Sequence, residues 1–104
     1  MAKELRIQSR ARTDIVTRAV FIGQDSVAAA NRFLDATDET FRSLRRQPFL
    51  GAEYRTSNLR LKGIRVVRVR GFRNYLVFYF ARPDEIEIVR VLHGSQDLDP
   101  ALDD

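Results

Sequence analysis

The sequence predicts an α+β domain in which a helical hairpin packs on one face of a twisted antiparallel sheet. Apolar residues recur at helical spacing through the first half of the chain, after a short alternating segment at residues 4–8. β-Branched and aromatic residues dominate residues 63–94 instead. The connections are short, so neighbouring elements should run antiparallel. The chain has 104 residues, and we expect a single domain, residues 1–104, in the order β-α-α-β-β-β.

The first half of the chain should contain two helices. Apolar residues at steps of three and four predict an amphipathic helix over residues 10–22, with Ser9 as its N-cap and Gly23 as its end. Ser26 is the expected N-cap of a second, longer helix that ends near Arg46. Because little chain separates the two helices, they should form an antiparallel hairpin.

The second half should form three strands, at residues 63–70, 73–81 and 84–94. The middle strand is apolar or aromatic on both faces. One face carries Tyr75, Val77 and Tyr79, and the other carries Leu76, Phe78 and Phe80. Helices can cover only one of these faces, so the other needs a second cover or a partner.

Two local features of the second half are less regular. In the strand at residues 63–70 the alternation of arginine and apolar residues slips, and a bulge near Val66 or Val67 would bring all its arginines to one face. The polar tail after Gly94 should be loose or form one short turn.

Charge is distributed unevenly along the chain. The formal net charge is +4, and between Arg42 and Arg73 the only acidic residue is Glu53 among ten basic ones. Such asymmetry suggests an anionic partner, either a nucleic acid or an acidic protein. Arginine also suits phosphate and carboxylate better than lysine does. The structural alternative is a solvated basic surface.

Several kinds of site are poorly supported by the composition. The chain has no cysteine and one histidine, His93, which counts against disulfides and zinc sites. It has no glycine-rich phosphate loop and no Ser-His-Asp set. We therefore expect no metal and no cofactor. No apolar run has the length of a membrane helix, so we expect a cytoplasmic protein without membrane contact.

Four segments carry a family resemblance. They read "ARTDIVTRAVFIGQDSVAAANRFLDA", "PFLGAEY", "LKGIRVVRVRGFRNYLVFYF" and "IEIVRVLHG". From about Leu5 to Leu98, the chain resembles the RelE/ParE superfamily, the toxin halves of bacterial type II toxin–antitoxin modules. The resemblance implies the microbial RNase-like toxin fold, which agrees with the expected order of elements.

The resemblance also implies an antitoxin partner, in a dimer or a heterotetramer. Antitoxins of this superfamily wrap a helix and an extended segment around the toxin, and often add a strand to its sheet. DNA would be bound only through that complex. The antitoxin-binding residues expected here are Tyr75, Val77, Tyr79 and Arg90. The structural alternative for the tyrosines is a place in the core.

The superfamily divides by target. ParE-like members poison DNA gyrase and need only a binding surface, expected here at Arg65, Arg68, Arg70 and Arg73. RelE-like members cut messenger RNA on the ribosome, and their catalytic groups would be Arg70, Arg90 and His93. "VRVLHG" followed by an acidic segment favours the ParE-like branch. The nuclease is the alternative, and a member that only binds its antitoxin is a second one.

Both Arg90 and His93 also have structural alternatives. Arg90 could pair with Glu85 or Glu87, which are close to it in sequence. His93 could be hydrogen-bonded at the end of its strand.

Overall fold

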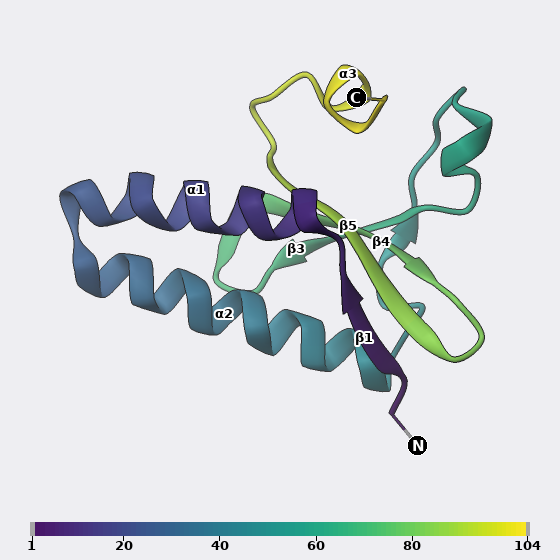
Figure 1. Ribbon diagram of the computed structural model, residues 1–104, viewed down its shortest axis with the longest axis horizontal. Coiled ribbons are helices and arrows are strands. Elements are labelled where there is room, and N and C mark those ends of the chain that lie inside the picture. Colours follow the sequence, from purple (N-terminus) through teal and green to yellow (C-terminus); the bar gives the residue numbers. More distant parts are fainter. Residues whose placement is uncertain (1, 104) are drawn as a thin grey trace.

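The strands form one mixed sheet, and two long helices pack as a hairpin on one of its faces (Figure 1). The computed structural model describes residues 2–103, so the two ends of the expected domain lie outside the described residues. The elements are β1 (Glu4–Ile7), α1 (Ser9–Asp25), α2 (Val27–Arg46), β2 (Ala52–Glu53), a 3₁₀ turn η1 (Leu59–Leu61), β3 (Arg65–Val69), β4 (Phe72–Ala81), β5 (Glu85–His93) and α3 (Leu98–Asp103). The predicted α+β fold with its helical hairpin is confirmed.

The sheet differs from the prediction in one respect. Its order is β1-β5-β4-β3-β2, and β1 pairs parallel with β5, so the sheet is mixed rather than antiparallel. The alternation of residues in a strand predicts which side chains share a face, but it carries no information about the direction of the neighbouring strand. The edge strand β2 and the helix α3 are additions to the predicted elements.

The helix boundaries confirm one predicted cap and correct two others. Ser26 caps α2, because its Oγ accepts a hydrogen bond from the backbone N–H of Ala29 at 3.1 Å. Ser9 is the first residue of α1 rather than its cap, and Gln8 holds the cap position without a side-chain hydrogen bond. Gly23 lies inside α1, which continues to Asp25. Packing on α2 stabilises this last turn, and a glycine costs only about 1 kcal/mol in a helix.

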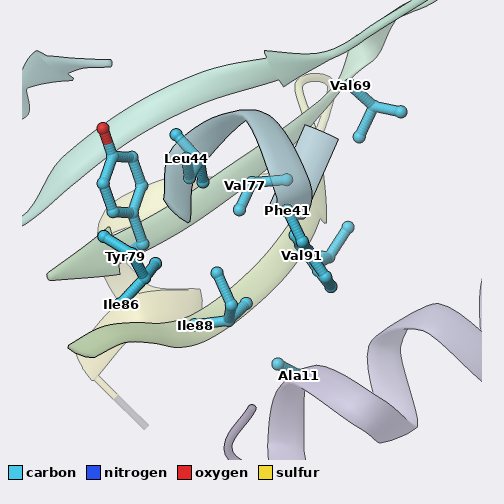
Figure 2. Packing of buried hydrophobic residues seen from close by; sticks show 9 residues of the cluster. All are labelled: Ala11, Phe41, Leu44, Val69, Val77, Tyr79, Ile86, Ile88 and Val91. Atoms are coloured by element: carbon cyan, nitrogen blue, oxygen red, sulfur yellow. The ribbon is translucent and has the colours of Figure 1, made fainter. Parts of the chain in front are cut away.

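The central strand β4 divides the core into two clusters. On the helical side its Val77 and Tyr79 are fully buried with Phe41 and Leu44 of α2 (Figure 2). On the opposite side, Phe78 and Phe80 pack against residues of η1 and α3. The chain's own segments around η1 and α3 therefore cover much of the second face of the sheet.

The irregularity in the pairing of β3 with β4 lies outside the predicted place, and its extra residues belong to β4. Pairing with β4 is regular from Arg65 to Arg68 and shifts between Arg68 and Val69. Arg65 and Arg68 therefore face opposite sides of the sheet, and the predicted bulge near Val66 or Val67 is wrong. Because both faces of β3 have an apolar cover, these two valines can be buried on opposite sides without a bulge.

Tyr79 links the sheet to the loop after α2. Its hydroxyl donates to the carbonyl of Pro48 at 2.7 Å and accepts from the backbone N–H of Gly51 at 2.9 Å. The backbone comes so close here that a Cβ on Gly51 would lie 2.6 Å from the Val66 carbonyl oxygen. The sequence "QPFLG" therefore ends α2 and also holds the chain against the sheet.

Removing the hydroxyl of Tyr79 should destabilise the protein. In Tyr79→Phe, the Gly51 N–H and the Pro48 carbonyl lose a buried partner, which should cost about 1–3 kcal/mol in chemical denaturation. Tyr75→Phe is the matched control, because no hydrogen bond of the Tyr75 hydroxyl occurs in residues 2–103; its effect should be below about 0.5 kcal/mol. Equal effects of the two changes would contradict this role of the hydroxyl.

Glu87 of β5 joins β1 to the rest of the sheet. Its carboxylate is 6 % exposed and accepts hydrogen bonds from Arg6 and Gln8, at 2.6 Å each, and from Arg82 at 2.9 Å. Burial opposes ionisation of this group, but the hydrogen bonds from Gln8 and Arg82 and the charges of both arginines outweigh it, so the pKa of Glu87 is lowered.

The lowered pKa of Glu87 predicts a pH-dependent contribution to stability. Its interactions stabilise the fold fully above about pH 5 and weaken as the pH falls through its folded-state pKa. Glu87→Gln should therefore cost about 1–3 kcal/mol at neutral pH, and the difference from the unmodified protein should shrink in acid. Denaturation midpoints across pH would measure this, with the exposed Glu53→Gln as control. A difference that grew in acid would contradict the assignment.

Candidate functional site

The expected target-binding arginines do not form one continuous row. Arg65 lies on the helical side of the sheet, where it donates to the carbonyl of Gly51 and places its guanidinium 4.8 Å from the ring centroid of Phe49. It is half-buried and holds the loop in place. Arg68, Arg70 and Arg73 are exposed. The exposed basic surface is therefore smaller than the sequence predicts.

Arg70 and Arg73 lie at the hairpin between β3 and β4. The backbone N–H of Arg70 donates to the Thr40 hydroxyl of α2 at 3.1 Å, which fixes the position of the strand end. Its side chain is 77 % exposed, and its guanidinium lies 4.0 Å from the Glu39 carboxylate. Gly71 adopts φ +81° in the turn between the two arginines, a conformation that favours glycine. The turn thus presents two cations to solvent at one end of the sheet.

Arg68 lies on the other face of the sheet, beside a cavity of about 540 Å³. Apolar and aromatic residues from four parts of the chain form most of its lining: Leu50, Gly51, Ala52, Tyr54, Val66, Val67, Arg68, Leu76, Phe78 and Leu98. Arg68 is the one charged residue among these. The apolar residues on both faces of β4 predict that this face needs a cover. They do not predict that Tyr54 and Leu98, from distant segments of the chain, contribute to it.

Arg90 has a structural partner. Its Nε and Nη2 donate to the two carboxylate oxygens of Asp14 at 2.7 and 2.9 Å, and its Nη1 donates to the Ala101 carbonyl at 2.6 Å. The two side chains are 12 % and 14 % exposed. Asp14 also accepts from the backbone N–H of Val91. Arg90 of β5 therefore joins α1 to α3. Its acidic partner is Asp14 of α1, whereas Glu85 and Glu87, the partners considered from the sequence, lie on its own strand.

His93 lies at the end of β5 in a local network. Its Nδ1 accepts the backbone N–H of Ser95 at 3.0 Å and lies 2.7 Å from the Ser95 hydroxyl. The ring of Tyr75 packs against the imidazole edge to face, with 4.9 Å between the centroids. These contacts, made with a neighbouring serine, are of the kind that the structural alternative describes, a histidine hydrogen-bonded at the end of its strand. No hydrogen bond or ion pair joins His93 to Arg70 among residues 2–103.

None of the residues expected to bind an antitoxin, Tyr75, Val77, Tyr79 and Arg90, is exposed. Val77 and Tyr79 are fully buried among the residues of the helical side, and neither presents surface to a partner in this structure. Tyr75 is half-buried beside Phe33 and His93. The exposed apolar side chains near the sheet include Phe49 and Leu50, in the loop before β2, and Leu59 of η1.

Other kinds of site receive little support from the described structure. Residues 2–103 contain no group of three or more acidic or histidine side chains that could hold a metal ion. Within the same residues, none of the helices combines the length and the hydropathy needed to span a bilayer. What the geometry offers is a binding surface, with a basic hairpin and an apolar cavity on adjoining parts of one sheet.

The Arg90–Asp14 pair should contribute strongly to stability. Asp14→Ala would leave a largely buried guanidinium without its carboxylate and should cost about 3 kcal/mol in chemical denaturation. Asp38→Ala is the matched control, because it breaks an exposed pair with Arg42 on α2, and should cost less than about 1 kcal/mol. A loss no larger for Asp14 than for Asp38 would contradict a structural role for Arg90.

Comparisons with known proteins agree with this fold. Residues 5–98 match the model of the family described as ParE toxin of type II toxin–antitoxin system, parDE. The fold is similar to a solved structure of the chromosomal ParDE TA system from P. aeruginosa, with a TM-score of 0.69 and 15 % identity over 88 % of this chain and 96 % of that one. Among proteins of curated function, no relative matches. Because the family model spans most of the sequence, the chain belongs to the ParE toxin family of type II toxin–antitoxin systems.

Proposed function

We propose that this toxin acts in the cytoplasm as a poison of DNA gyrase and is neutralised by its cognate antitoxin. Membership of the ParE family supports a toxin with an antitoxin partner. Gyrase as the target is our inference from the kind of surface that the chain presents.

The state of Arg90 is the observation that favours gyrase poisoning over RNA cleavage. A nuclease needs cations that are free to hold the scissile phosphate, together with a base and an acid within reach of it. Arg90 donates instead to Asp14 and to the Ala101 carbonyl, in a largely buried position between α1 and α3. Of the three candidate catalytic residues, this leaves only Arg70 and His93, which share no hydrogen bond or ion pair in the described chain.

A binding surface makes smaller demands on geometry. Exposed arginines at the β3–β4 hairpin can meet acidic groups of a protein target or the phosphates of DNA that such a target holds. Arg70 and Arg73 are the exposed arginines of that hairpin. Arg68 is also exposed and comes two residues before Arg70, on β3. These residues are the proposed contacts with gyrase.

An assay of DNA supercoiling by gyrase and an assay of messenger RNA cleavage on the ribosome, run side by side, distinguish the two targets. Purified toxin should inhibit supercoiling of relaxed plasmid by gyrase and should trap cleaved DNA, while ribosome-bound messenger RNA stays intact. Addition of the antitoxin before gyrase should restore supercoiling. Cut message with normal supercoiling would overturn the proposal and make Arg70 and His93 candidates for catalysis.

Variants of the hairpin should locate the contact with gyrase. The double change Arg70→Ala and Arg73→Ala should weaken inhibition of supercoiling by about tenfold or more, because both cations are lost from the contact. Arg12→Ala is the control, since Arg12 is an exposed arginine of α1, away from the hairpin. If Arg12 mattered as much as the hairpin, the effect would reflect net charge alone.

A further inference from the structure

The cavity beside Arg68 is an unfilled part of an otherwise covered face. On this side of the sheet, residues of η1 and α3 pack over Phe78 and Phe80. Leu98 lies at the edge of this cover and lines the cavity of about 540 Å³ together with Leu50 and the half-buried Leu76, while Phe78 below them is fully buried. At its mouth Leu50 is 50 % exposed, a high value for a large apolar side chain beside a cavity. An apolar ligand group would complete the cover.

The chain's own α3 shows which chemistry this face accepts. The helix alternates apolar and acidic residues, and Leu98 and Leu102 pack into the second core cluster. The Asp99 carboxylate accepts a hydrogen bond from the Tyr54 hydroxyl at 2.6 Å, and Asp103 accepts one from the Asn58 side chain at 2.8 Å. Each apolar residue that enters the face is thus followed by an acid that bonds to the loop between β2 and β3.

Tyr54 belongs both to the contact with α3 and to the lining of the cavity. Its hydrogen bond to Asp99, with partial burial and the charges of nearby aspartates, raises the pKa of Tyr54 to about 12. The hydroxyl therefore stays protonated and donates to a carboxylate at neutral pH. The α3 contact and the open cavity form one continuous surface, with Tyr54 between them.

Arg68 places a positive charge at the open cavity. Its side chain is exposed at the cavity, and no ion pair of Arg68 occurs among residues 2–103. The side of the cavity formed by β2 and β3 is strongly basic, since Glu53 is the only acid between Arg42 and Arg73, and the acidic residues of α3 lie on the side of Tyr54 and Leu98. A segment that binds here should therefore bring its own carboxylate.

We propose that the cavity is the docking site for an acidic amphipathic segment of the antitoxin, which places one apolar side chain on Leu50 and Leu76 and a neighbouring carboxylate on Arg68. This proposal rests on the proposed function, in which the toxin has an antitoxin. Like α3, the segment combines an apolar residue with a neighbouring acid, and it extends the cover that η1 and α3 form over this face of the sheet. An arginine with an adjacent apolar pocket is the kind of site where a few residues supply most of the binding energy.

Two pairs of variants test this docking site. Purified toxin is titrated with its cognate antitoxin by isothermal calorimetry, after circular dichroism has shown that each variant is folded. Arg68→Glu should weaken binding by about tenfold or more, whereas Arg73→Glu, the same change of charge at the hairpin, should have an effect below about threefold. Leu50→Asp should also weaken binding by about tenfold, whereas Leu59→Asp, at a residue that is 86 % exposed and outside the cavity, should not.

Exchanging the charges of the two partners identifies the antitoxin carboxylate that binds Arg68. Each acidic residue of the antitoxin is changed to lysine in turn, and one of these changes should restore most of the affinity that Arg68→Glu removes. Hydrogen exchange of the complex should also show protection of residues 52–54 and 65–68, which lie around the cavity.

The outcomes separate this proposal from the proposed function. Tight binding of the antitoxin that is unchanged by Arg68→Glu and Leu50→Asp would overturn the docking site and leave the antitoxin partner intact. Absence of any antitoxin binding to the unmodified toxin would overturn both. If Arg68→Glu abolished binding of a single-stranded RNA oligonucleotide and spared the antitoxin, the cavity would be a nucleic-acid site, and the proposal would also be wrong.

Discussion

The structure depends on a central strand that is apolar on both of its faces. Val77 and Tyr79 point to one side of β4, and Phe78 and Phe80 point to the other. Full burial of a large apolar side chain contributes roughly 1.5–3 kcal/mol, so leaving either face open would remove much of the stability of a small domain. The chain therefore has to supply two covers. The helical hairpin is the first, and the segments around η1 and α3 are the second.

The need for two covers also explains the placement of the arginines. A layer as short as α3, which has six residues, contributes little apolar area of its own. Arg90 of β5 connects the two covers, because it donates hydrogen bonds to Asp14 of α1 and to a carbonyl of α3. Arg65 similarly holds the loop before β2. These guanidinium groups serve the fold, while Arg68, Arg70 and Arg73 remain exposed and available for recognition.

Periodicity in the sequence predicted the elements and the faces better than it predicted the partners. The helices, the three later strands and the two-sided burial of β4 follow from spacing, because each depends on residues close together in the chain. The direction of β1 and the cover by α3 depend on segments far apart in sequence. The same holds for Arg90, whose acid is 76 residues away. No local pattern marks such a pair, whereas Glu85 and Glu87 looked suitable only because they are near in sequence.

The position of the cavity on β3 bears on how an antitoxin could neutralise the toxin. Arg68 at the cavity and Arg70 at the hairpin belong to one short stretch of chain, and Arg73 lies just beyond the turn. A segment docked on Arg68 would therefore occupy one of the cations that we assign to gyrase and lie beside the other two. Its acidic residues would lower the local positive potential as well as occupy space, since exposed charges act over about 8–10 Å at physiological salt. Neutralisation by such a segment would need no change of fold, because the antitoxin would only extend the acidic cover that α3 begins.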